Sequence, residues 1–438
     1  MAVVLFIIDG LGDRPQNVKV GRKTETGTPL ELARKPNLDY LAKNGQTGLM
    51  ITHGKGIKPE SEDAHLRIFG YDPGKYMKGR GPLEALGAGL DLLPGDVAFR
   101  SNFAYAEEGK YGLNGFKIID RRAGRISTKE AHAIAKNIGL GSLKFDNVEF
   151  IFKPTVEHRG VLVMKPESNV KLSYNITGND QSHYDIPGPV ALPLDASAEA
   201  KRTVDLLNKY IMVTHDLLKK DKANIQRAKK GLPQANFILV RGPGIYSLVP
   251  PIKEKYGLKA ACVAGAALYK GAAKFVGMDV YDVKGATGDK NTNLKAKIRK
   301  VEQLLKLNMK SKFKGHKRYD LIFLHVKAAD AFSHDKDFLG KMKFIEKIDR
   351  AIGPDLKRIA KEHNIIILGD HTTPCSIGDH TDDPIPVLVV GKNVVLGKSK
   401  PATQFGEKWC AKGQLGTIYG KDVIGLIQKL SSDIKKSL

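Results

Sequence analysis

Four short apolar runs constrain the fold of this chain more than any other feature of its sequence. Each run is rich in Val, Ile and Leu and is bounded by Asp, Gly or Pro; the runs are Val3–Ile8, Leu321–Val326, Ile365–Leu368 and Val387–Val390. Unbroken runs of this kind are typical of strands buried on both faces of a parallel sheet, because a half-exposed strand alternates apolar and polar residues. Since helical patterns alternate with them, we expect an α/β fold whose core is a mostly parallel sheet with helices on both faces.

Caps and apolar periodicity mark the helices between these strands. Thr28-Pro29 predicts the start of one helix, and Pro36 predicts the start of another that ends at Gly45. Longer helices are expected at Ala261–Val276, Leu294–Leu307, Phe338–His363 and Val423–Lys435.

The middle of the chain has a different pattern. Phe150–Lys153 and Val161–Lys165 predict a hairpin, which is followed by a polar stretch rich in Asn, Gly, Ser and Pro, a helix near Ser197–Lys219 and a strand at Phe237–Val240. Continuous apolar strands return only after about residue 258. We therefore predict a discontinuous core domain of residues 1–89 and 256–438, interrupted by a smaller α/β domain of residues 90–255.

The charge of the chain is strongly positive. The 71 Lys and Arg residues against 47 Asp and Glu residues give a net charge of +24, which is compatible with nucleic acid, an anionic small substrate or a solvated lysine-rich surface. Aromatic residues make up 7% and are not interleaved with the basic ones, so we expect solvated faces and no nucleic-acid partner. The densest basic run is predicted on the outer face of an amphipathic helix and its continuation: Lys295, Lys297, Arg299, Lys300, Lys306, Lys310, Lys312, Lys314, Lys317 and Arg318.

The cellular compartment is predicted from cysteine content and apolar length. Three cysteines in the whole chain cannot form a disulfide framework, which favours a reducing interior. The first apolar run, Ala2–Ile8, has no basic segment before it and stops at Asp9, so it is interpreted as a strand and not a signal peptide. No run approaches the about 18 apolar residues of a membrane helix. We expect a soluble cytoplasmic protein that does not bind a membrane.

Acidic and imidazole side chains follow the predicted strands. Asp9 ends the first strand, and the others follow later strands: Asp330, His334, Asp370, His371 and His380. Each has an ordinary alternative, such as a turn cap or a surface pair. Because loops after parallel strands gather at one sheet edge, however, their coincidence predicts two divalent-metal sites with mixed nitrogen and oxygen ligands.

Ser61 is the candidate nucleophile. The apolar residues after it predict a short helix that begins at the serine, and the free N–H groups of a helix N-terminus favour a phosphoryl group. A divalent ion on the hydroxyl would supply the activation that serine lacks at neutral pH. An ordinary serine N-cap is equally compatible with this segment.

Five ordered motifs carry a resemblance that spans nearly the whole chain. They are Asp-Gly-Leu-Gly-Asp-Arg-Pro (9–15), Ser-x-x-Ala-His-Leu-x-Ile-Phe-Gly-Tyr-Asp-Pro (61–73), Gly-Arg-Gly-Pro-Leu-Glu-Ala-Leu-Gly (79–87), Asp-Arg-Arg-Ala-Gly-Arg-Ile (120–126) and Gly-Asp-His-Thr-Thr-Pro-Cys (369–375). The chain resembles the archaeal type of cofactor-independent phosphoglycerate mutase, within the alkaline phosphatase superfamily.

This resemblance implies an isomerase that interconverts 3-phosphoglycerate and 2-phosphoglycerate in glycolysis and gluconeogenesis. It implies that Ser61 forms a phosphoserine and that two divalent ions, usually manganese, with zinc or cobalt also compatible, are bound. One ion would be held by Asp9, Ser61, Asp370 and His371, and the other by Asp330, His334 and His380. The inserted domain would close over the site and exclude water, since hydrolysis competes with transfer.

The same resemblance implies cationic donors for the substrate's carboxylate and phosphate. The candidates are Arg121, Arg122, Arg125, His158, Arg159, Arg241 and Lys270, with Asp120 as an acid or base toward the glycerate hydroxyls. The chain departs from the family pattern at Glu60 and Asp63, which add negative charge beside Ser61, and at Phe332-Ser333, where the family commonly has Gly before the histidine. A phosphatase or phosphotransferase for another small phosphorylated metabolite is the alternative function.

Overall fold

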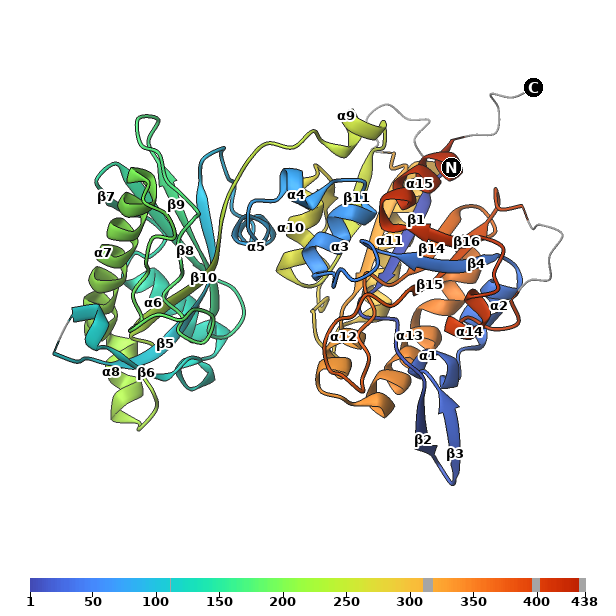
Figure 1. The fold of residues 1–438 in the computed structure, drawn as a ribbon, viewed down its shortest axis with the longest axis horizontal. Coiled ribbons are helices and arrows are strands. Elements are labelled where there is room, and N and C mark those ends of the chain that lie inside the picture. Colours follow the sequence, from blue (N-terminus) through green and yellow to red (C-terminus); the bar gives the residue numbers. More distant parts are fainter. Residues whose placement is uncertain (111, 310–317, 396–401, 433–438) are drawn as a thin grey trace. The chain divides into compact units, whose positions relative to one another are not determined.

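The computed structural model describes residues 1–110, 112–309, 318–395 and 402–432. Within these residues the chain forms two compact units, one of residues 1–73 and 250–438 and one of residues 74–249 (Figure 1). The sequence predicted an insert of residues 90–255. The second unit begins earlier than this, because the helix over Gly81–Gly87 packs on a strand of the second unit.

The first unit contains an eight-stranded sheet. In the order in which they pair, the strands are β12 (Asp279–Val280), β11 (Ala260–Val263), β13 (Leu321–Val326), β1 (Val3–Ile8), β14 (Asn364–Leu368), β15 (Ile385–Gly391), β4 (Gln46–Ile51) and β16 (Gly416–Tyr419). Among these strands, β15 alone runs antiparallel to its neighbours, so the prediction of a mostly parallel sheet is confirmed. The prediction that Val387–Val390 is a parallel strand is wrong, because β14 and β15 are joined by a loop without the crossover that parallel strands need.

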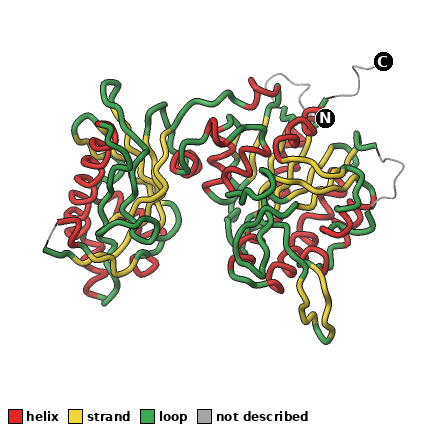
Figure 2. Tube along the Cα trace, in the orientation of Figure 1, coloured by secondary structure: helices red, strands yellow, loops and turns green. Residues whose placement is uncertain are grey.

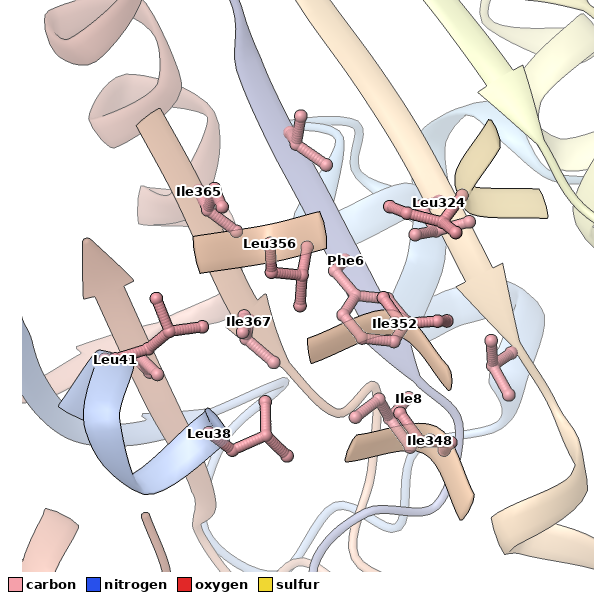
Figure 3. Packing of buried hydrophobic residues seen from close by; sticks show 14 of the residues in the cluster. Phe6, Ile8, Leu38, Leu41, Leu324, Ile348, Ile352, Leu356, Ile365 and Ile367 are labelled. Atoms are coloured by element: carbon pink, nitrogen blue, oxygen red, sulfur yellow. The ribbon is translucent and has the colours of Figure 1, made fainter. Parts of the chain in front are cut away.

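β1 lies at the centre of this sheet because all six of its residues are apolar and buried. Its neighbours are β13 and β14, and Phe6 is in register with Leu324 on one side and Ile367 on the other. Figure 3 shows Phe6 and Ile8 against the side chains of a long helix over Phe338–Ile359. β1 is therefore fixed in the core, and the residues directly after Ile8 lie at the carboxyl-terminal ends of the central strands.

Helices cover both faces of this sheet (Figure 2). The helices of the unit are α1 (Pro29–Leu32), α2 (Pro36–Lys43), α3 (Ser61–Ile68), α9 (Ile252–Tyr256), α10 (Ala267–Phe275), α11 (Leu294–Met309), α12 (Ala328–His334), α13 (Phe338–Ile359), α14 (Glu407–Cys410) and α15 (Val423–Ser431), with a 3-10 turn at Gly420–Asp422. Helices α2, α11 and α13 share one apolar cluster with Phe6 and Leu324. On the opposite face, Phe323 contacts α3 through Phe69, and His325 stacks on Tyr269 of α10.

Several predicted helices differ from the structure, and α11 ends at Met309 rather than Leu307. The predicted helix Ala261–Val276 begins with a strand, β11, because its first apolar residues pair with β13 before α10 starts. Helix α13 ends at Ile359 rather than His363. Helix α15 ends at Ser431, and the predicted end at Lys435 lies outside the described residues.

One lysine of the basic run is not on an outer face. Lys297 of α11 is fully buried, and its Nζ donates a hydrogen bond to the carbonyl of His325 over 3.0 Å. Lys310, Lys312, Lys314 and Lys317 lie outside the described residues. No helix of the described residues is long and apolar enough to cross a membrane.

The second unit is a six-stranded antiparallel sheet with helices. Its strands are β5 (Val97–Glu107), β6 (Lys117–Asp120), β7 (Leu143–Phe145), β8 (Val148–Pro154), β9 (Arg159–Pro166) and β10 (Phe237–Ile245), in the order β10-β5-β9-β8-β7 with β6 beside β5. Its helices are α5 (Gly81–Gly87), α6 (Thr128–Asn137), α7 (Ala198–Lys220) and α8 (Lys222–Lys229), with 3-10 turns at Gly112–Gly115 and Ala123–Arg125. The predicted hairpin is β8–β9. Outside this sheet, β2 (Gln16–Val20) and β3 (Lys23–Gly27) form a hairpin of the first unit, and α4 (Pro73–Tyr76) lies at the division between the units.

Candidate metal centre and nucleophile

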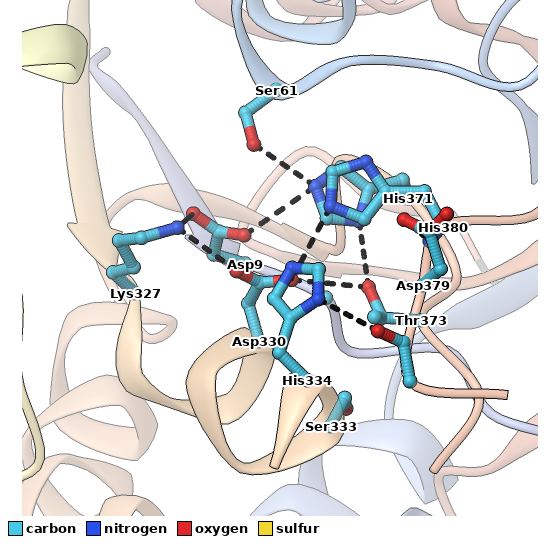
Figure 4. A network of polar contacts seen from close by, with 12 residues as sticks. Asp9, Ser61, Lys327, Asp330, Ser333, His334, His371, Thr373, Asp379 and His380 are labelled. Atoms are coloured by element: carbon cyan, nitrogen blue, oxygen red, sulfur yellow. Dashed lines mark hydrogen bonds and ion pairs between the residues drawn. The ribbon is translucent and has the colours of Figure 1, made fainter. Parts of the chain in front are cut away.

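The metal-ligand candidates converge at one edge of the eight-stranded sheet (Figure 4). Asp9 directly follows β1, Asp330 and His334 lie on α12 directly after β13, and Asp370 and His371 follow β14. β1 pairs in parallel with both β13 and β14, so their carboxyl ends are neighbours. Gly10 makes this approach possible, since it has a φ of +64° and a Cβ there would lie 2.8 Å from the Cα of Asp330.

Asp330, His334 and His380 form one group of possible ligands, whose ligand atoms all lie within 4.8 Å of one another. Asp330 Oδ1 lies 3.3 Å from His334 Nε2 and 3.5 Å from His380 Nε2. The two histidines come from α12 and from the loop between β14 and β15. One carboxylate and two imidazoles are therefore close enough together to bind a single ion.

Asp9, Asp370 and His371 form a second group within the same limit of 4.8 Å. His371 Nε2 lies 3.5 Å from Asp9 Oδ1, 3.3 Å from Asp370 Oδ2 and 3.1 Å from Ser61 Oγ. All four side chains are buried. The structure thus places the predicted nucleophile beside this second group.

The histidines of both groups are oriented by their other ring nitrogen. His334 Nδ1 lies 2.9 Å from the carbonyl of Gly378, and His380 Nδ1 lies 2.9 Å from the carbonyl of Pro59. His371 Nδ1 lies 2.9 Å from the hydroxyl of Thr373. A carbonyl acceptor requires a proton on Nδ1, so in the neutral ring of His334 or His380 the lone pair lies on Nε2, which is the usual arrangement of a metal-binding histidine.

The buried carboxylates fit a bound cation. Asp9 Oδ1 and Asp370 Oδ2 are buried and have no hydrogen-bond partner among the residues that the structure describes. Burial, with the nearby Asp9 charge, raises the pKa of Asp370 well above its usual range. Carboxylate and imidazole donors together suit manganese, zinc or cobalt. A divalent ion in the group of Asp9, Asp370 and His371 would supply the partner that both of these oxygens lack.

Ser61 is the first residue of α3 and not its N-cap. The N-cap is Glu60, which makes no side-chain capping bond, so the Ser61 hydroxyl is free to face His371. The ordinary serine N-cap that the sequence left open is therefore wrong. The charge nearby is acidic: burial, then Glu62 and Glu60, raise the pKa of Asp63 to about 6.

Comparison with known proteins decides the family. The chain is 41% identical over 434 residues to 2,3-bisphosphoglycerate-independent phosphoglycerate mutase 1 of Methanocaldococcus jannaschii, covering 99% of this chain and 98% of that relative. The chain belongs to the 2,3-bisphosphoglycerate-independent phosphoglycerate mutase family. The model of this family matches residues 42–224.

Solved structures agree with this family over both units. The cofactor-independent phosphoglycerate mutase from Thermoplasma acidophilum is 32% identical with a TM-score of 0.66, over 99% of this chain and 100% of that one. A protein of solved structure from Pyrococcus horikoshii is 34% identical with a TM-score of 0.76, over 99% of this chain and 98% of that one.

The sequence analysis of this mutase-family chain did not predict Lys327, which lies between the two groups of candidate metal ligands. Its Nζ lies 2.9 Å from Asp330 Oδ2 and 3.5 Å from Asp9 Oδ2, so it connects the two groups. Burial opposes the Lys327 charge, but Asp9, Tyr269 and Asp330 raise its pKa well above the usual range. The signal was its position directly after the strand Leu321–Val326, three residues before Asp330.

Two predicted substrate arginines meet in the second unit. The buried carboxylate of Asp180 accepts hydrogen bonds from Arg121 Nη2 at 2.5 Å and Arg241 Nη1 at 3.3 Å. Arg241 Nη1 also donates to Asn102 Oδ1 at 2.6 Å, whereas its buried Nε has no partner among the described residues. The Nε of Arg241 is therefore a buried donor that the described residues leave without an acceptor.

Several of the other predicted substrate residues lie near one another in the second unit, since the charges of Arg159, Arg122 and Arg241 all act on His158. Arg122, Arg125 and Arg159 are exposed, and His158 is half-buried with its pKa lowered to about 4 by burial and then by the Arg159 charge. Asp120 accepts backbone N–H bonds from Arg122 at 2.8 Å and Gly124 at 2.6 Å. In the first unit, Lys270 Nζ pairs with Asp282 Oδ1 at 2.5 Å.

Proposed function

We propose that this chain interconverts 3-phosphoglycerate and 2-phosphoglycerate by passing the phosphoryl group through Ser61. The observation that carries the proposal is the Ser61 hydroxyl, 3.1 Å from His371 Nε2 beside a cluster of three carboxylates and three imidazoles. The names of the family relatives support the same isomerisation. The product is an isomer of the substrate, so the enzyme needs no second substrate.

The reaction would consist of two transfers in opposite directions. In the first, Ser61 Oγ loses its proton and bonds to phosphorus, the bond from phosphorus to the C3 oxygen breaks, and that oxygen takes up a proton to give glycerate. In the second, the C2 oxygen of glycerate loses its proton and bonds to phosphorus, and Ser61 Oγ leaves and regains its proton. Splitting one transfer into two is the role of a covalent intermediate.

Asp9, Ser61, Asp370 and His371 would hold one divalent ion, and Asp330, His334 and His380 the other. Bound ions would lower the pKa of the serine hydroxyl and neutralise charge on the phosphoryl oxygens. Manganese is the ion proposed for both positions because the resemblance to the mutase family implies it, and the mixed carboxylate and imidazole donors are compatible with manganese, zinc or cobalt. Lys327 would add a fixed positive charge beside both groups.

The arginines of the second unit would bind the anionic ends of the substrate. Asp180 holds Arg121 and Arg241 in fixed orientations, and the free Nε of Arg241 offers a donor to a carboxylate or phosphate. Arg122, Arg125, Arg159 and His158 are the further proposed contacts there, and Lys270 is proposed from the first unit. Asp120 holds the turn that carries Arg122, and we retain it as the proposed acid or base toward the glycerate hydroxyls.

The test follows the phosphoryl group. Purified chain with Mn²⁺ and 3-phosphoglycerate should form 2-phosphoglycerate, which enolase converts to a product detected by its ultraviolet absorbance. Rapid acid quench with substrate labelled in its phosphate should leave label on the protein, and Ser61→Ala should lose both the label and the activity. Ser333→Ala is the matched control, because Ser333 is also buried in this unit but gives its hydroxyl to the carbonyl of Ala329 at 3.3 Å.

Two results would contradict the proposal. Release of inorganic phosphate as fast as 3-phosphoglycerate disappears would identify a phosphatase. Label retained on Ser61→Ala would place the covalent intermediate on another residue.

The proposed location is the cytoplasm, which is supported by Cys262, Cys375 and Cys410, all buried and without a disulfide.

A further inference from the structure

The two oxygens of the Asp9 carboxylate have different surroundings. Oδ1 faces His371 Nε2 at 3.5 Å and has no hydrogen-bond partner among the described residues. Oδ2 accepts a hydrogen bond from the Tyr269 hydroxyl and lies 3.5 Å from Lys327 Nζ and 3.3 Å from His325 Nε2. One oxygen is therefore left for an ion while the other is held by the protein.

Tyr269 is itself held tightly. Its side chain on α10 is 1% exposed, and its ring stacks on His325 with centroids 3.7 Å apart and planes at 25°. The ring of His65 lies 4.9 Å from the Tyr269 ring, and His65 Nδ1 lies 2.7 Å from the carbonyl of Ser61. Packing of this kind fixes the position of the tyrosine hydroxyl, and the hydroxyl in turn fixes the carboxylate.

We propose that Tyr269 is a positioning residue for the Asp9, Asp370 and His371 site alone. Its hydrogen bond holds the Asp9 carboxylate in the orientation that directs Oδ1 toward His371, so the ion site is formed before the ion arrives. The proposal rests on the proposed metal centre. Hydrogen bonds behind a metal ligand typically change metal affinity about 10–100-fold when they are removed.

The second site shares Lys327 with the first but has a further support of its own in Thr373, which makes the proposal selective. Asp330 Oδ1 accepts a hydrogen bond from the Thr373 hydroxyl at 3.2 Å, and Asp330 Oδ2 accepts one from Lys327 at 2.9 Å. Among the described residues, the Tyr269 hydroxyl bonds to Asp9 and to Lys327 Nζ at 3.0 Å and not to the Asp330 carboxylate. Loss of one hydroxyl should therefore weaken one ion site and spare the other.

The experiment measures Mn²⁺ binding to the full chain by electron paramagnetic resonance of the free ion, without substrate. Tyr269→Phe keeps the ring and its stack on His325. It is tested in two backgrounds: His334→Ala, which leaves the Asp9 site, and Asp370→Asn, which leaves the Asp330 site. The matched control is Tyr319→Phe, since Tyr319 is also buried in this unit but donates to Asp279 at 2.7 Å.

The expected result is a Kd about 10–100-fold higher for Mn²⁺ at the Asp9 site and a change of less than about twofold at the Asp330 site. Tyr319→Phe should change neither. Equal weakening of both sites, or no change at the Asp9 site, overturns the role of Tyr269 while the metal centre stands. Fewer than two Mn²⁺ ions on the unmodified chain would overturn the metal centre and this inference with it.

Discussion

Replacement of Lys341 by methionine should destabilise the first unit and also weaken its metal binding. Lys341 lies on α13 and is fully buried. Its three ammonium protons are all used: Nζ lies 2.9 Å from Asp13 Oδ2, 3.0 Å from the carbonyl of Gly12 and 3.2 Å from the carbonyl of Thr373. Asp13 is buried as well, so the pair is cut off from water.

The magnitude follows from the charge that the substitution leaves behind. Methionine retains most of the apolar stem of lysine, so little packing is lost. The Asp13 carboxylate remains buried, with hydrogen bonds from the backbone N–H groups of Arg14 and Cys375 but without its cation. Removing one partner of a buried ion pair costs about 3–5 kcal/mol, and we expect the free energy of unfolding to fall by that amount.

The effect on the metal centre has a separate cause. Gly12 lies three residues after Asp9, and Thr373 lies two residues after His371. The Lys341 ammonium therefore ties together the two loops that carry the ligands of one site. Without it those loops separate more easily, and Mn²⁺ affinity at that site should fall.

Lys35→Met is the matched control. Lys35 is also a buried lysine of this unit, but its Nζ pairs with Asp39 at 3.0 Å on α2. Urea unfolding, followed by circular dichroism and by the fluorescence of the single tryptophan, Trp409, should show a loss for both variants. Mn²⁺ titration should show a loss for Lys341→Met only. A stability loss under about 1 kcal/mol for Lys341→Met, or equal metal affinities in the two variants, would refute this reasoning.

Two further predictions concern a carboxyl in each unit. Burial raises the pKa of Glu407 to about 7 from 4.5, so the folded chain retains a proton that the unfolded chain releases, and stability falls as pH rises between these values. Glu407→Gln should remove that slope and gain at most about 3 kcal/mol at about pH 8, measured by thermal unfolding against pH. Asp180→Asn should loosen Arg121 and Arg241 and raise KM for phosphoglycerate by about tenfold, equivalent to about 1.4 kcal/mol, with kcat less affected; an unchanged KM would contradict this.

The metal-ligand candidates were predictable because strand ends determine where they lie. Asp9 and Asp370 each follow an apolar run within two residues, and parallel pairing of those runs brings them to one edge. To predict that Asp330 and His334 lie together, it was enough to infer in addition that their segment is helical, because residues four apart then lie on one face. Local patterns sufficed here because the sheet supplies the long-range geometry.

The second layer of the site could not be predicted in the same way. Tyr269 and His65 lie on α10 and α3 at positions with ordinary core spacing, and nothing in their local sequence distinguishes them from packing residues. Their contact with each other and with His325 depends on how two helices pack on one face of the sheet. The direction of β15 was missed for a related reason, since burial on both faces determines that a strand is internal but not which way it runs.

The charges of the centre imply an order of binding. Without ions, burial and the Asp9 charge raise the pKa of Asp370 well above its usual range, so Asp370 keeps its proton and only Asp9 and Asp330 contribute negative charge. Lys327 and a protonated His334, whose pKa its bond to Asp330 raises to about 9, balance those two charges, and no net positive charge remains to attract an anionic phosphate ester. Two divalent ions that displace the protons of His334 and Asp370 leave two positive charges instead. We therefore expect this cluster to attract an anionic phosphate ester only after both proposed ions have bound.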